Sequence, residues 1–87
     1  MTFTVVPGPG VEAAFKKIAK KDPARFEQVA KKLRELAENP EAGKPLRNKL
    51  KGNRRLHIGH YVLIYKIEKK KQQIILIDYA HHDDVYK

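Results

Sequence analysis

The sequence predicts a single α+β domain in which a helical hairpin packs on one face of a mostly antiparallel sheet. The chain has 87 residues, which is room for one domain. Two stretches between residues 11 and 37 repeat apolar side chains at helical spacing. From residue 46 onwards, β-branched and aromatic side chains gather in short segments with turn-forming breaks between them. The expected element order is β-α-α-β-β-β over residues 1–87.

The first expected element is a short edge strand over residues 2–7. Phe3 and Val5 lie on one face of it, and a Pro-Gly-Pro-Gly segment at residues 7–10 closes it with a turn. A first helix of about ten residues follows. One side of this helix is lysine-rich. The opposite, apolar side consists of Val11, Ala14, Phe15, Ile18 and Ala19.

A second, longer helix is expected to begin at Pro23, with Asp22 as its N-cap, and to end at Asn39-Pro40. Its apolar stripe runs from Phe26 to Ala37. The tight turn between the two helices predicts an αα-hairpin. Because each helix has only one apolar face to bury, the pair needs a sheet to pack against.

The second half of the chain supplies that sheet. Strand-like segments span residues 46–50, 54–58, 61–68 and 73–79, and their short connections imply antiparallel neighbours. Breaks fall at Gly52, at Gly59 and at a run of three lysines at 69–71. The lysine run is interpreted as a solvated hairpin tip.

The charge balance narrows the classes of partner. The chain has 19 Lys plus Arg against 10 Asp plus Glu, a net charge of +9, so polyanions such as RNA, DNA, a ribosome or an acidic protein are expected to bind. With no Cys, a disulfide and a thiolate metal site are excluded. No signal peptide and no membrane-spanning stretch are found, which favours a cytoplasmic protein. No cofactor is expected.

Four motifs follow one another in the C-terminal half. They read NPEAGKPL at 39–46, LKG at 50–52, RLHIGHYVLIY at 55–65 and HHDDVY at 81–86. Together with the element order, they resemble the RelE/ParE toxin superfamily, and within it the ribosome-dependent messenger-RNA endonucleases. Val62 and His82 stand where many RelE-type members carry Arg. The histidine pattern is more similar to the YafQ-type branch, which uses imidazoles where other members use Lys and Arg.

The resemblance implies a toxin of a type II toxin–antitoxin system. Such an enzyme would cut messenger RNA in the ribosomal A site without a metal and so inhibit translation. It also implies a cognate acidic antitoxin, RelB-like, that wraps the toxin and neutralises its basic surface.

The chemistry of metal-free RNA cleavage suits the residues present. One group takes the proton of the 2′-hydroxyl, another donates to the leaving 5′-oxygen, and cations stabilise the phosphate. Histidine titrates near neutrality and can serve in both roles. Arg55 and His57 are two residues apart on a predicted strand and share one face, while Leu56 and Ile58 point to the helices. The C-terminal tail could return His82 to that open face.

His57 and His82 are therefore predicted as the acid–base pair, without assigning which is the acid. Arg55 is expected to stabilise the phosphate. Tyr86 either stacks on a base or packs with Val85 as an apolar plug at the sheet edge.

Further contacts to RNA or phosphate are expected from basic and imidazole side chains near this pair. A second phosphate-stabilising cation would be Lys51 or Arg54. A metal site made of consecutive residues at 81–83 is not expected, because such residues rarely converge on one ion. The predicted RNA-binding set is Lys49, Lys51, Arg54, His60 and His81.

Two alternative functions keep the same fold. A ParE-like protein would poison DNA gyrase by binding it and would need no acid–base pair. An inactive relative would persist as a binding module for nucleic acid or protein.

Overall fold

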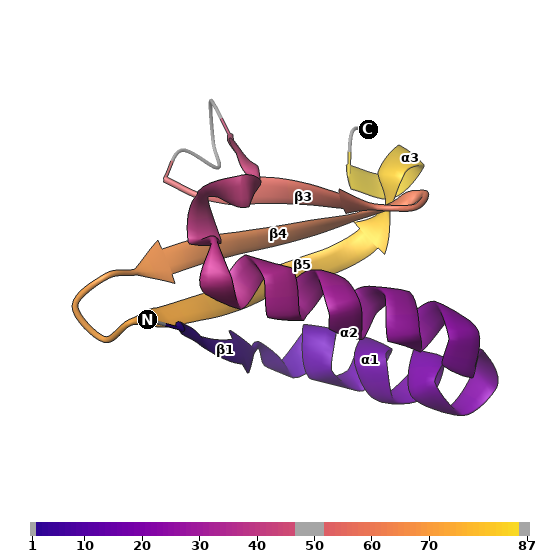
Figure 1. Cartoon of the computed structure of the whole chain (residues 1–87). Coiled ribbons are helices and arrows are strands. Elements are labelled where there is room, and N and C mark those ends of the chain that lie inside the picture. Colours follow the sequence, from indigo (N-terminus) through magenta and orange to yellow (C-terminus); the bar gives the residue numbers. More distant parts are fainter. Residues whose placement is uncertain (1, 47–51, 86–87) are drawn as a thin grey trace.

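The computed structural model of the protein describes residues 2–46 and 52–85, and it contains five strands and three α-helices in the described part (Figure 1). The strands are β1 (Thr4–Pro7), β2 (Lys44–Pro45), β3 (Arg54–Ile58), β4 (Tyr61–Glu68) and β5 (Gln73–His81). The helices are α1 (Pro9–Lys21), α2 (Pro23–Glu38) and the short α3 (His82–Val85), with a 3-10 turn, η1 (Pro40–Ala42), after α2.

The strands form one mixed sheet in the order β1-β5-β4-β3-β2. β1 runs parallel to β5, and the other three pairings are antiparallel. The helical hairpin carries the chain from β1 at one edge of the sheet to β2 at the opposite edge. The predicted α+β class, with a mostly antiparallel sheet, is confirmed.

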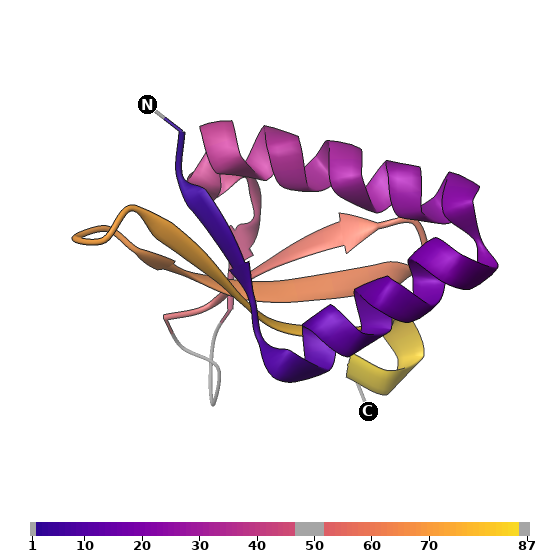
Figure 2. The same cartoon turned by 90° about the horizontal axis from the view of Figure 1, so that it is seen from below.

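The two long helices lie side by side against one face of the sheet (Figures 1 and 2). The predicted start of α2 is confirmed: the Asp22 carboxylate accepts a hydrogen bond of 3.2 Å from the backbone N–H of Arg25. The first helix begins earlier than predicted, at Pro9 inside the expected turn. Proline suits the first helical position because its φ is already helical. Its lack of an N–H costs nothing there, since the first N–H groups of a helix have no acceptor within the helix.

The core lies between the helices and that face of the sheet. Leu63 and Tyr65 of β4 are fully buried there, and Leu56 and Ile58 of β3 also pack into it, as predicted. The two long helices contribute five buried side chains: Val11, Phe15, Val29, Leu36 and Ala37.

A β-bulge in β5 was not predicted from the alternation of side chains. Tyr65 pairs with Leu76 and Ile64 pairs with Asp78, so that Ile77 has no partner across the strand. The extra residue lets Leu76 and Tyr79 both face the helices although they are three apart. Ile77, the extra residue of the bulge, is 42% exposed.

Three further boundaries differ from the predictions. Of the expected strand over 46–50, residues 47–50 lie outside the described residues, and the strand seen in this region is β2, which ends at Pro45. β5 continues two residues further than expected, to His81. The polar tail then turns into α3.

Across residues 2–46 and 52–85, none of the helices is both long and apolar enough to cross a membrane.

Candidate functional site

His57 and His82 come together on the face of the sheet that the long helices leave uncovered. Their ring centroids are 5.9 Å apart, with the ring planes inclined by 32°. His57 is an exposed residue of β3, and His82 is the first residue of α3. The backbone N–H of His82 donates to the carbonyl of His60 at 2.9 Å, which fixes the chain at the point where it turns after β5. The end of β5 thus brings His82 to the open face.

The pair lies beside an apolar floor. Val62 is the β4 partner of His57 and of Ala80, and it is fully buried although it faces away from the main core. Ile64, two residues further along β4, is 4% exposed. Because Val62 and Ile64 are packed closely, the side chains of His57 and His82 lie on the surface of the sheet and not between its residues.

Arg55 points to the same side as His57, two residues earlier on β3. It is half-buried, its Nε atom is fully buried, and its partner across the strands is Ile64 of β4. We call Arg55, His57 and His82 the open-face cluster. It combines one permanent cation with two groups able to accept or donate a proton.

Arg54 belongs to the opposite side of β3. Its Nη1 donates to the carbonyl of Gly43 at 2.6 Å and approaches the carbonyl of Glu41 at 3.4 Å. The hydroxyl of Tyr65 holds the same turn, donating to the Pro40 carbonyl at 2.7 Å and accepting from the Gly43 N–H at 2.9 Å. The structure therefore does not bring Arg54 to the open-face cluster, and its contacts stabilise the turn after α2.

Burial raises the pKa of the Tyr65 hydroxyl, although its hydrogen bond from Gly43 and the charge of Arg54 act in the other direction. The group therefore stays neutral and available as a donor in the folded protein.

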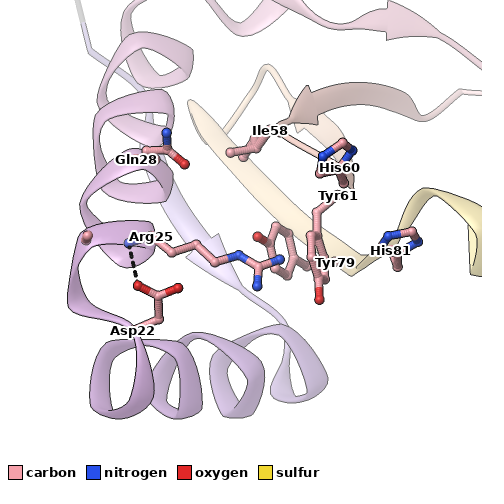
Figure 3. Close-up of a pocket in the computed structure, with 10 residues that line it drawn as sticks. Asp22, Arg25, Gln28, Ile58, His60, Tyr61, Tyr79 and His81 are labelled. Atoms are coloured by element: carbon pink, nitrogen blue, oxygen red, sulfur yellow. Dashed lines mark hydrogen bonds between the residues drawn. The ribbon is translucent and has the colours of Figure 1, made fainter.

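His60 and His81 form a second pair on the helix side of the sheet. Their rings stack with centroids 6.4 Å apart, and His81 meets the ring of Tyr61 edge-on at 5.4 Å. Figure 3 shows both imidazoles beside a cleft that opens between the start of α2 and the β3–β4 turn. The structure thus divides the four histidines into two pairs and does not place His60 and His81 in the open-face cluster.

This helix-side cleft has a volume of about 460 Å³. The Arg25 guanidinium lies 3.8 Å above the Tyr61 ring, and Tyr61 stacks against Tyr79 at 5.0 Å. Burial raises the pKa of Tyr79, while hydrogen bonding from Arg25 and the Arg25 charge act in the other direction. The cleft is lined by Asp22, Ala24, Arg25, Gln28, Ile58, Gly59, His60, Tyr61, Tyr79 and His81.

Asp83 lies between the two histidine pairs. Its carboxylate oxygens are each 3.7 Å from a histidine Nδ1, one from His82 and the other from His81. Its backbone N–H donates to His81 Nδ1 at 3.2 Å. The His81 Nδ1 atom that accepts this bond carries no proton, so only the contact with His82 can become an ion pair, and the 83% exposure of the Asp83 side chain lets water weaken it.

Three predicted contact residues, Lys49, Lys51 and Tyr86, lie outside the described residues. Over the described part of the chain, His, Asp and Glu side chains form no group of three or more that could hold a metal ion.

Sequence reasoning missed Arg25 and Tyr79 as site residues. Arg25 reads as an ordinary helix-surface residue, and only the bulge in β5 turns Tyr79 toward the helices.

Comparison with solved structures defines the class of fold. The toxin described as YoeB/ParE from Agrobacterium tumefaciens matches with a TM-score of 0.82 at 18% identity, over 91% of this chain and 98% of that one. The toxin–antitoxin complex RelBE2 from Mycobacterium tuberculosis contains a chain that matches with a TM-score of 0.79 at 24% identity, over 93% of this chain and 99% of that one. The fold is therefore that of small toxins from toxin–antitoxin pairs.

Sequence comparison then gives the family. The family described as the ParE toxin of type II toxin–antitoxin systems, parDE, matches residues 9–86. The RelE4 protein of Methanocaldococcus jannaschii is 31% identical over 80 residues, which cover 91% of this chain and 85% of that protein. The chain belongs to the RelE/ParE superfamily of type II toxin–antitoxin toxins, as its motifs predicted.

Proposed function

We propose that this toxin, a single domain over residues 1–87, is an endoribonuclease that cuts messenger RNA in the ribosomal A site and so stops translation. The observation that carries the proposal is the pairing of His57 and His82, 5.9 Å apart beside Arg55 on the open face. A toxin that acted only by covering a protein surface would need no such pair.

The reaction follows from the two imidazoles. One takes the proton from the 2′-hydroxyl, whose oxygen attacks the adjacent phosphorus, and the other donates a proton to the leaving 5′-oxygen. The products are a 2′,3′-cyclic phosphate and a 5′-hydroxyl. Arg55 stabilises the negative charge that builds on the phosphate oxygens. Water and metal take no part in this step.

Other parts of the proposal rest on the sequence and on the family. Lys49, Lys51 and Tyr86 remain predicted contacts to the RNA. The predicted phosphate role of Arg54, His60 and His81 would require RNA to reach the helix side of the sheet. An acidic, RelB-like antitoxin is the proposed partner, since the chain carries a net charge of +9. Action on ribosomes would place the protein in the cytoplasm.

The experiment is expression of the wild type, His57→Ala and His82→Ala in a bacterial host. Growth is followed together with primer-extension mapping of cuts in translated messages. We expect growth arrest and cuts with the wild type, and neither with the two variants, which should retain the folded far-UV spectrum. Arrest by both variants with unchanged cuts would refute the proposed chemistry.

The match to a family described by the ParE toxin favours a second candidate, a gyrase inhibitor. Incubation of the purified protein with gyrase and relaxed plasmid separates the two. Inhibited supercoiling without message cleavage would support the gyrase candidate, and the reverse result would support the nuclease.

A further inference from the structure

The helix-side cleft holds a set of groups that fits an anion. Arg25 supplies a permanent positive charge, and His60 and His81 supply imidazole donors at the opposite wall (Figure 3). The N-terminus of α2 also opens here, and its positive end adds to the field. The only acidic side chain on the lining is Asp22, whose carboxylate already accepts the backbone N–H of Arg25.

The hydroxyl of Tyr79 is the second indication of a ligand. Tyr79 lines the cleft and is only 8% exposed, and its buried hydroxyl oxygen makes no hydrogen bond of good geometry in the described part of the chain. The Arg25 guanidinium approaches the hydroxyl as a hydrogen-bond donor, and this contact and the Arg25 charge both lower the pKa of Tyr79 against the effect of burial. Because a guanidinium can only donate, the buried O–H of Tyr79 still lacks an acceptor among the described residues, and an anionic acceptor in the cleft would supply one.

The positive field continues outside the cleft. An adjoining hollow on the other side of Arg25, about 300 Å³ in volume, is lined by Lys17 and Lys21 of α1 together with Tyr61 and Tyr79. A chain bound at Arg25 would therefore also lie near the lysines of α1. A partner that carries several negative charges fits this arrangement better than a single small anion.

The aromatic rings favour a carboxylate over a nucleobase. The Tyr61 ring is covered by Arg25 at 3.8 Å and also stacks against Tyr79 at 5.0 Å. Tyr79 in turn meets the ring of Phe15 edge-on at 5.4 Å. A base could stack here only by displacing Arg25 from Tyr61, whereas a carboxylate can bind the exposed edge of the guanidinium and leave the stack intact.

We infer that the helix-side cleft binds an Asp or Glu side chain of an acidic partner peptide, between the Arg25 guanidinium and the Tyr79 hydroxyl. Identification of that peptide as part of the antitoxin rests on the proposed function, whereas the carboxylate chemistry does not. A peptide held there lies next to Gly59 and His60 in the β3–β4 turn, beyond which lies the open-face cluster. The cleft is thus an anchor from which an inhibitory chain can extend over the RNA-cutting face.

The test is a titration of the purified, ¹⁵N-labelled full chain with an acetylated, amidated hexaglutamate peptide, followed by NMR. We expect saturable shifts at the Arg25 Nε–H and at the amides of Tyr79 and His81, with smaller effects at His57. Arg25→Gln and Tyr79→Phe should each raise the Kd about tenfold or more, since each removes one hydrogen bond to a charged acceptor.

Arg34→Gln is the matched control, because Arg34 is exposed on α2 outside the cleft lining and the substitution removes the same charge. It should change the Kd less than twofold. Tyr79→Phe leaves the net charge intact, so it reports on the cleft even if Arg25→Gln fails to fold.

Three results would overturn the inference: no saturable binding, equal weakening by Arg25→Gln and Arg34→Gln, or tighter binding of a hexauridylate RNA at the same cleft residues. The last would make the cleft an RNA subsite. The titration needs neither ribosomes nor cleavage, so its outcome is independent of the growth and primer-extension results for His57→Ala and His82→Ala.

Discussion

The imidazoles of His57 and His82 face each other at 5.9 Å, although one lies in β3 and the other begins α3. The relationship depends on the full length of β5, which carries the chain back past β4 to the β3–β4 turn. There the N–H of His82 bonds to the carbonyl of His60. This pair of imidazoles on an otherwise strand-lined face is the arrangement on which the proposed nuclease activity rests.

Alanine substitution at either member of this pair should slow cleavage of ribosome-bound message by about 10² to 10⁴, the usual contribution of a general acid or base. The histidines of the other pair lie on the helix side, so His60→Ala and His81→Ala should slow it far less. Single-turnover cleavage on programmed ribosomes measures all four rates. Equal losses in the two pairs would contradict the division of labour between the faces.

The adjacent arginines should differ in the same way. Arg55→Ala should lower the cleavage rate by about 10² to 10³, because it removes the permanent cation of the open-face cluster. Arg54→Ala should instead lower the free energy of unfolding by about 1 to 3 kcal/mol, through loss of the hydrogen bond to the Gly43 carbonyl. Urea unfolding and cleavage assays on both variants separate the two effects. A large loss of cleavage for a stably folded Arg54→Ala would return Arg54 to the predicted phosphate site.

The sequence predicted the architecture because its main signals are local. Asp22-Pro23 marks the start of α2, and the alternation of Arg55, Leu56 and His57 assigns the faces of β3. Such patterns depend only on the period of a helix or strand. The face of β3 that carries the candidate histidine could therefore be predicted before its partner was located.

The division of the histidines could not be predicted, because it depends on features that have no periodic signature. His81 and His82 are neighbours in sequence but lie on opposite sides of the sheet. His81 ends β5 on the helix side, and His82 begins α3 on the open face. The cleft around Arg25 and Tyr79 requires both the bulge at Ile77 and the docking of α2 over the sheet. These are tertiary contacts between distant segments.

Two glycines should respond oppositely to alanine. A Cβ on Gly43 would collide with the carbonyl of Arg55 and would lie 2.6 Å from the Tyr65 hydroxyl, so Gly43→Ala should destabilise the fold by about 1 to 3 kcal/mol. Gly10 lies in α1, and a Cβ there would meet nothing within 4 Å. Gly10→Ala should therefore stabilise by about 0.5 to 1 kcal/mol. Urea midpoints give both values, and a stabilised Gly43→Ala would show that the turn can move aside.

Tyr65→Phe should destabilise the protein by about 1 to 3 kcal/mol at neutral pH, because it leaves the Pro40 carbonyl and the Gly43 N–H without their partner. Tyr79→Phe provides the contrast. Its buried hydroxyl has no hydrogen bond of good geometry among the described residues, so this change should be neutral or slightly stabilising at the same pH. A loss for Tyr79→Phe as large as for Tyr65→Phe would show that Arg25 bonds that hydroxyl strongly.

The cost of Tyr65→Phe should also depend on pH. Burial raises the pKa of Tyr65 in the folded state above the ordinary tyrosine value of about 10, so the unfolded chain loses this proton first as the pH rises. Stability from the neutral hydroxyl is therefore complete below about pH 10 and declines as the pH rises through the folded-state pKa. Phenylalanine cannot ionise, so the stability gap between the wild type and Tyr65→Phe should narrow above about pH 10. Urea unfolding at neutral pH and in alkaline steps measures that gap, and a gap that stayed constant with pH would contradict a neutral, buried Tyr65.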